Sequence, residues 1–305
     1  MRTYVVERLV DTGLTCVAIS FVVFVFLHLA GDPAKVLLPP EASKEAVADL
    51  RRSLGLDDPF FVQYGRFLAN ALRGEFGDSF IIRDKALAIL LERAPATIEL
   101  ALAGLLVGVA LAVPLGILAA YRPRSWVDHL ASIVSVVGQA VPTFWLGILL
   151  ILVFAVQLRW FPVYGGEGLM TLVLPAVTLG VWAMARTARI TRSSMLEVLH
   201  QDFLRTARAK GVGEWSVILR HALRNCAIPI VTALGLELGN LLGGAVITEA
   251  VFAYPGIGRL AVEAVINKDV PLIQAVVLTV GAAILLLNIL IDVVYVALDP
   301  RIRLA

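Results

Sequence analysis

Long stretches without any charged side chain constrain this chain more than any other feature. Each is long enough to cross a hydrocarbon layer of about 30 Å as a helix. Five such runs cover residues 12–31, 100–121, 130–158, 168–185 and 270–291. Only 16% of the 305 residues are charged, against about 25% in soluble proteins. We therefore expect a membrane protein built from helices.

A sixth apolar stretch, residues 225–248, is interrupted by one acidic residue. Glu237 lies at its middle, and a carboxylate inside a membrane is unfavourable unless it faces protein or water. Counting this stretch gives six transmembrane helices and an all-α, polytopic fold. A cleaved signal peptide is the alternative for residues 12–31, but this run is longer than the usual core of about 7–15 residues and no small-residue cleavage site follows it.

Basic residues favour one orientation of these spans. Fourteen Lys and Arg residues fall on one side of a six-span arrangement, within residues 2–8, 122–124, 186–224 and 301–303. The short loops of the other side hold only Arg159, Arg259 and Lys268. Because short cytoplasmic loops are enriched in Lys and Arg, we expect both termini in the cytoplasm.

This arrangement divides the chain into parts. The expected parts are residues 1–31 with the first span, 32–99 as an external segment, 100–298 as a core of five spans with a cytoplasmic loop at 194–224, and 299–305 as a cytoplasmic tail. In the external segment, apolar residues recur at helical spacing after Pro59. Either this amphipathic helix caps the spans or it docks an external partner.

The cytoplasmic loop has the pattern of two short amphipathic helices joined by a glycine turn. Gly211 is suited to end the first helix, because glycine adopts the left-handed conformation of a helix cap. The basic side chains of the loop either hold it on anionic lipid headgroups or bind a partner. The apolar face comprises Leu196, Leu199, Phe203, Leu204 and Ala207 before the turn, and Trp215, Ile218, Leu219, Ala222 and Leu223 after it.

This loop resembles the coupling loop of ATP-binding-cassette (ABC) importer permeases. Aligned on Gly211, the match to the loose family pattern is partial, because Arg205 stands where that pattern has Glu and its proline is displaced to Pro229. The string DFLRTARAKG, followed by RHALRN and IP, is similar to the dipeptide, oligopeptide and nickel branch. Other segments resemble that branch in the expected order: GDPA at 31–34, LGLDDPFFVQY at 54–64, GEFGDS at 74–79, PATIELA at 95–101, EAVFAYPGIGRL at 249–260 and LDPRIR at 298–303.

The resemblance implies a type I ABC importer permease fold in a bacterial inner membrane. It implies a second homologous permease, two ATP-binding-cassette ATPase subunits and an external substrate-binding protein as partners, besides membrane lipid. ATP and Mg²⁺ would bind to the partner ATPases, so we expect no cofactor, metal or catalytic site in this chain. In agreement, none of its five lysines follows a glycine, as a phosphate-binding loop requires. The net charge of +2 gives no indication of a nucleic-acid partner.

Candidate functional residues fall into three groups. The resemblance places contacts with the ATPases at Arg205, Thr206, Ala207, Arg208, Gly211, Arg220 and His221. The four-residue spacing of Gly235, Gly239 and Gly243 predicts a face for close helix packing. Polar residues of the last two spans, predicted to line the translocation pathway, are Glu237, Asn240, Asn288 and Asp292; for Asp292 the alternative is a hydrogen bond to a neighbouring helix.

We expect this chain to pass short peptides across the membrane. The same machinery carrying a nickel chelate or glutathione is the alternative within the family. A proton-coupled secondary transporter is the alternative of another class, but it predicts an inverted repeat that the sequence does not show. An enzyme is disfavoured, because the four histidines have no metal-binding spacing.

Overall fold

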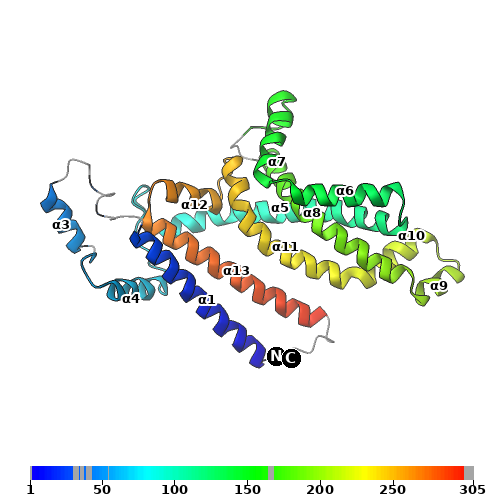
Figure 1. Ribbon diagram of the computed structural model, residues 1–305, viewed down its shortest axis with the longest axis horizontal. Helices are drawn as coiled ribbons and strands as arrows, with labels where there is room; N and C mark the ends of the chain where they lie inside the picture. The colour runs from blue at the N-terminus through cyan, green and yellow to red at the C-terminus, as the bar shows by residue number, and fades with distance from the viewer. Residues whose placement is uncertain are drawn as a thin grey trace. The chain divides into compact units, whose positions relative to one another are not determined.

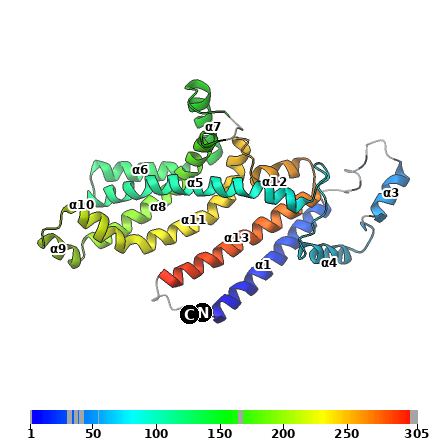
Figure 2. The same cartoon turned by 180° about the vertical axis from the view of Figure 1, so that it is seen from behind.

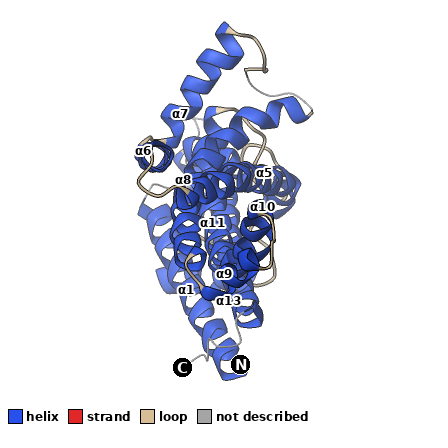
Figure 3. Cartoon of the chain, turned by 90° about the vertical axis from the view of Figure 1, so that its right-hand side faces the viewer, coloured by secondary structure: helices blue, strands red, loops and turns tan. Residues whose placement is uncertain are grey.

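The structure of the protein is a computed structural model. It describes residues 2–29, 34, 38, 43–53, 55–163 and 168–298, and within these the side chains of 2–7, 9 and 292–298 are not described. This part of the chain consists of helices and loops, as Figure 3 shows. Asp78 and Lys85 form one isolated bridge within a loop. The all-α prediction is therefore confirmed for this part of the chain.

The helices follow one another through most of the chain (Figure 1). Two of the elements, η1 and η2, are π-helices, which are wider than α-helices. In chain order the helices are α1 (Arg2–Leu29), α3 (Lys44–Ser53), α4 (Phe60–Ala71), α5 (Ala86–Tyr121), α6 (Trp126–Ala140), α7 (Thr143–Leu150), η1 (Ile151–Gln157), α8 (Leu169–Leu199), α9 (Asp202–Ala209), α10 (Glu214–Ser216), η2 (Val217–Ala222), α11 (Leu223–Val251), α12 (Ile257–Ile266) and α13 (Val270–Leu298).

Five stretches are long and apolar enough to cross a membrane, and a sixth crossing is possible through a bent pair. The five are Val10–Leu29, Ala86–Tyr121, Leu169–Leu199, Glu214–Val251 and Val270–Ile291. The bent pair, α6 with α7 and η1, changes direction by 103°. The six-span count holds when this pair is one span.

The bend lies inside a run that the sequence presents as one uninterrupted apolar stretch. Val141 has an extended backbone with ψ of 122°, and Pro142 precedes the first residue of α7. A proline disfavours the helical conformation of the residue before it, so the helix ends at Ala140 and a new one starts at Thr143. Figure 1 shows α7 leaving the direction of α6.

The chain forms two compact units. The first comprises Met1–Pro95 and Gly256–Ile289. Here α4 packs on α1 through aromatic rings, because the ring of Phe24 lies 5.3–5.5 Å from those of Phe60, Tyr64 and Phe67. The amphipathic helix expected after Pro59 is therefore present and contacts the first span, as a cap would.

A buried aspartate also orders the first unit. Asp269 accepts hydrogen bonds from the Ser79 hydroxyl at 2.5 Å and from the backbone N–H of Phe80 at 3.2 Å. It also accepts the N–H of Leu272, in the first turn of α13, at 3.4 Å. A single carboxylate thus fixes a loop and the start of a helix.

The second unit comprises Ala96–Pro255 and Leu290–Arg303, and α8 is its central helix. It contacts α6, α7 and α11, and Figures 1 and 2 show α6 running beside it. α5 approaches α8 at glycines: a Cβ at Gly108 would lie 3.1 Å from the Ala183 Cβ, and one at Gly116 would lie 2.6 Å from the Thr191 Cβ. Absent side chains let these helices pack at short distance.

Candidate functional site

The loop between α8 and α11 folds as short helices on either side of a glycine turn. α9 ends before Lys210, and Gly211 follows with a φ of +80°. The Gly211 N–H donates to the Arg208 carbonyl at 2.9 Å, and the Val212 N–H donates to the Ala207 carbonyl at 3.2 Å. These two bonds form the Schellman motif that ends many helices. The predicted left-handed conformation of Gly211 is confirmed.

The helix before this turn is shorter than its apolar spacing predicts. Leu196 to Ala207 reads as one helix, but α8 ends at Leu199 and α9 begins at Asp202. The connecting Gln201 has an extended backbone with ψ of 149°. The break allows α9 to contact η2, where Leu204 is fully buried.

A small apolar core lies beneath the loop. It joins α9 to the membrane-spanning helices through side-chain contacts, and Ala207 is half-buried against it. α9 is therefore linked to α8 and α11 through packed atoms as well as through the chain. The fully buried members from these elements are Met195, Leu204, Val217, Ile218, Ala222 and Cys226.

An ion pair connects the two helices that flank the glycine turn. Arg208 on α9 donates two hydrogen bonds to the Glu214 carboxylate on α10, at 3.1 and 3.0 Å. The Glu214 carboxylate raises the pKa of Arg208 above its usual value. This bidentate geometry holds the two helices on either side of Gly211 together.

The other residues predicted to contact an ATPase lie mostly on the surface of the loop. Arg205 and Thr206 on α9 are exposed, as is Arg220 on η2, whereas His221 is half-buried. Arg205 pairs with Asp202 at 3.3 Å, and both side chains are largely exposed. Their contact with an ATPase stays a prediction.

The predicted apolar face of the loop is divided between buried and exposed residues. Ile218 and Ala222, four residues apart on η2, are fully buried together with Val217. Trp215 and Leu219 are exposed in the chain by itself, and so is Phe203. The exposed apolar side chains are free to contact another protein.

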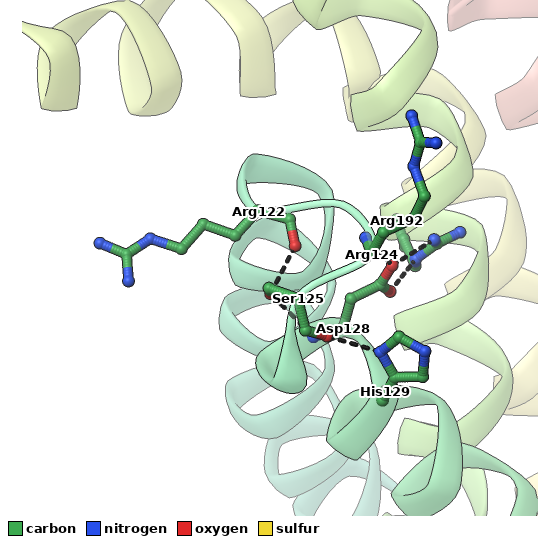
Figure 4. A network of polar contacts seen from close by, with 6 residues as sticks. All are labelled: Arg122, Arg124, Ser125, Asp128, His129 and Arg192. Carbon is green, nitrogen blue, oxygen red and sulfur yellow. Dashed lines mark hydrogen bonds and ion pairs between the residues drawn. The ribbon is translucent and has the colours of Figure 1, made fainter.

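A polar network missed by sequence reasoning joins α6 to α8 (Figure 4). Arg192 on α8 donates to both oxygens of Asp128, at 2.5 and 2.8 Å. Asp128 also accepts the backbone N–H of Arg124 at 2.9 Å, and Ser125 caps α6 by accepting the Asp128 N–H. Ser-x-x-Asp before an apolar helix is a capping signal that could have located this end of α6. The pairing with Arg192 left no signal in the sequence.

The predicted pathway residues differ in exposure. Glu237 is fully buried and its Oε1 lies 3.3 Å from Nη1 of Arg186 on α8. Asn240, predicted on the same stripe, is exposed, and so is Asn288 on α13. The side chain of Asp292 lies outside the described residues. Arg186 was not among the predicted residues, although it is the first charge after an apolar run.

The predicted glycine packing face on α11 is open at Gly243. A Cβ there would have no atom within 4 Å among the residues that the structure describes. Glycines on other helices do pack closely, among them Gly116 of α5 against α8 and Gly147 of α7 against Phe252. A role for Gly235, Gly239 and Gly243 in packing stays a prediction.

Two of the resembling segments meet at a buried hydrogen bond. The Thr97 hydroxyl on α5 donates to Glu249 Oε1 on α11 at 2.7 Å, and both residues are buried. The Tyr254 hydroxyl donates to Glu99 at 3.4 Å beside it. These hydrogen bonds therefore join the segment PATIELA to the segment EAVFAYPGIGRL.

Comparison with known proteins agrees with this architecture. The family model for the binding-protein-dependent transport system inner membrane component matches residues 112–304, and the model for the N-terminal part of such components matches residues 1–101. The chain belongs to this family of ABC importer permeases, and it is a multi-pass protein of the inner membrane.

Curated relatives match over nearly the full length. A probable peptide ABC transporter permease of Sinorhizobium fredii is 41% identical over 99% of this chain and 100% of its own length. A glutathione transport system permease of Escherichia coli is 41% identical over 99% of each chain. An inward-facing structure of the MetNI methionine ABC transporter matches with a TM-score of 0.58, at 19% identity, over 69% of this chain and 96% of its own. The last match shows the fold alone.

Proposed function

We propose that this chain is the subunit through which an ATP-driven importer passes short peptides. The observation that carries the proposal is α9, a short helix held by a glycine cap on a core that continues into α8 and α11. Relatives named as peptide and glutathione permeases support short peptides as the solutes, since glutathione is itself a tripeptide.

The proposal requires partner chains. A second homologous permease would complete the pathway, and two ATPase subunits would bind ATP and Mg²⁺ and hydrolyse ATP, so this chain would carry no enzymatic activity. An external substrate-binding protein would deliver the peptide. Exposed groups on the loop, among them Arg205, Thr206 and Trp215, suit a contact with another protein because they combine charge with apolar surface.

The mechanism follows from how the loop is attached. Closure of the ATPases around ATP would displace α9, and the core around Leu204 and Met195 would pass this displacement to α8 and α11. Well-packed cores move as units rather than deforming, so the spans would tilt and open the pathway to the other side. The Arg208–Glu214 pair would keep the loop from bending at the turn instead.

The test is uptake by the reconstituted complex. This chain, its neighbouring permease, the ATPases and the binding protein are placed in vesicles with a mixed pool of di- and tripeptides, glutathione and a nickel chelate. We expect peptide uptake that requires both ATP and this chain. Uptake of the nickel chelate alone would contradict the proposed solute, and proton-driven uptake by this chain alone would contradict the importer.

A further inference from the structure

One ion pair joins two membrane-spanning helices of the second unit, and its arginine is the first charge after the apolar run 168–185. Glu237 Oε1 on α11 and Arg186 Nη1 on α8 are 3.3 Å apart. Glu237 is the midpoint of Leu223–Val251, which places it about 21 Å from either end at 1.5 Å per residue. The Glu237 side chain is 1% exposed, whereas that of Arg186 is 45% exposed.

The buried carboxylate is poorly satisfied. Neither Glu237 oxygen accepts a well-formed hydrogen bond from any residue that the structure describes, and the Asn240 amide is the other polar side chain beside it. A buried charge held this loosely is costly for stability. Ionisable residues inside a membrane are retained mainly for function, so a structural role alone does not account for the pair.

The arginine has unused donors. A guanidinium carries five N–H groups in a planar fork, and the ion pair of Arg186 with Glu237 within the described part of the chain engages one of its nitrogens, Nη1. Half of its side chain is exposed on a membrane-spanning helix, where an exposed charge faces water or protein rather than lipid. Arg189, Ser193 and Glu197 continue the exposed positions of α8 towards its cytoplasmic end, so this side is polar.

The free part of the guanidinium fork matches a carboxylate. Arg binds carboxylates through two parallel N–H bonds, and every unmodified peptide carries one carboxylate at its C-terminus. The peptide amine is not an alternative ligand, because Arg186 would repel it and Glu237 is not accessible to it. We propose that Arg186 binds the C-terminal carboxylate of the peptide during its passage and that Glu237 is the positioning residue that holds the guanidinium. This inference rests on the peptide solutes proposed above.

The experiment compares a tripeptide, trialanine, with its C-terminal amide in the reconstituted complex. The binding protein has its own preference, but it is the same in every sample, so a change in the acid-to-amide uptake ratio reports on the permease. The variants are Arg186→Gln, Arg186→Lys and Glu237→Gln. Arg189→Gln is the matched control, because it removes an exposed arginine one turn along α8. Uptake is normalised to complex inserted and to basal ATP hydrolysis.

We expect Arg186→Gln to lower acid uptake about tenfold, the loss of one charged hydrogen-bonded contact, with amide uptake nearly unchanged. Arg186→Lys should keep part of the preference for the acid over the amide, because lysine keeps the positive charge but lacks the two parallel N–H donors of the guanidinium. Glu237→Gln should raise KM for the acid and not for the amide, a split that general destabilisation would not produce. Arg189→Gln should leave the ratio as in the wild type.

Failure of the carboxylate contact can be distinguished from failure of the proposed function. Suppose that the wild type imports peptides and that Arg186→Gln lowers the uptake of trialanine and of its amide equally, or lowers the uptake of neither. The proposed contact with the carboxylate is then wrong, while the proposed function stands. If the wild type imports neither peptide but imports the nickel chelate, the proposed function is wrong and the inference fails with it.

Discussion

At the scale of single residues, Gly211 and Asp128 shape this protein in opposite ways. Gly211 acts through what it lacks: its φ is +80° and no atom of the described residues lies within 4 Å of an added Cβ, so a replacement is opposed by backbone conformation and not by crowding. Asp128 acts through its side chain, which is nearly buried and accepts hydrogen bonds from Arg192 and from the Arg124 backbone.

Replacing Gly211 should therefore disturb the turn by an amount set by conformation. Gly211→Ala should destabilise the loop by about 1–2 kcal/mol, and Gly211→Asn by less, because Asn tolerates the left-handed region. ATP-dependent uptake should fall in the same order. The matched control is Gly213→Ala, since Gly213 is equally open but has a φ of −61°. Equal effects at both glycines would contradict a conformational role.

Removing the Asp128 carboxylate should leave Arg192 without its partner. Asp128 is buried but the Arg192 side chain is 34% exposed and can be hydrated, so Asp128→Ala should cost about 1–3 kcal/mol and lower the unfolding temperature of the purified chain. Arg189→Ala, which removes the hydrogen bond to Gln139 at an exposed position, should change it little. The double variant Asp128→Ala with Arg192→Ala should lose less than the two single losses added together, and additive losses would show that the pair is not coupled.

At the scale of the elements, closely packed glycines and broken helices set the bundle. α5 meets α8 at glycines where a Cβ would collide, as at Gly116, whereas the glycine face of α11 is open at Gly243. The run from α6 to η1 bends by 103° at Pro142, so one apolar stretch supplies two directions of helix. The bundle thus depends on positions where the backbone approaches or turns, as much as on apolar faces.

These two glycine environments predict different outcomes for the same substitution. Gly116→Ala puts a Cβ 2.6 Å from the Thr191 Cβ and 2.8 Å from the Ala188 carbonyl, and such overpacking costs about 1–3 kcal/mol. Gly243→Ala should leave the unfolding temperature of the isolated chain unchanged. If Gly243 packs on a second permease, Gly243→Leu should reduce the yield of the assembled complex in co-purification. Full assembly with Gly243→Leu would remove this face from the interface.

At the scale of the whole molecule, orientation in the membrane follows from the charge of the connecting segments. The loop that carries α9 is rich in arginine, and the segment around α3 and α4 follows the first span. Six crossings with a cytoplasmic N-terminus place these two segments on opposite sides. The proposed coupling to ATPases requires α9 to be on the cytoplasmic side.

Labelling of introduced cysteines tests this orientation. The native Cys16 and Cys226 are first replaced by Ala, and Lys44→Cys or Lys210→Cys is then introduced. A membrane-impermeant thiol reagent should label Lys44→Cys in cells whose outer membrane alone is permeabilised, and label Lys210→Cys only after the inner membrane is opened. The reverse pattern would invert the orientation and contradict the coupling role of α9.

The helical membrane architecture, the family resemblance and the glycine turn at Gly211 could all be predicted from the residues alone. Each of these depends on a property that is local along the chain: the length of an uncharged run, the residues of a motif, or the conformational freedom of one glycine. The pairing of polar groups, in contrast, could not be predicted before the folded chain was seen. Asp128 pairs with a residue 64 positions away and Glu249 with one 152 positions away, and the buried Glu237 is paired with Arg186 of another helix. Helical spacing assigns a residue to a side of its own helix, but which helix covers that side is set by packing between segments far apart in the chain.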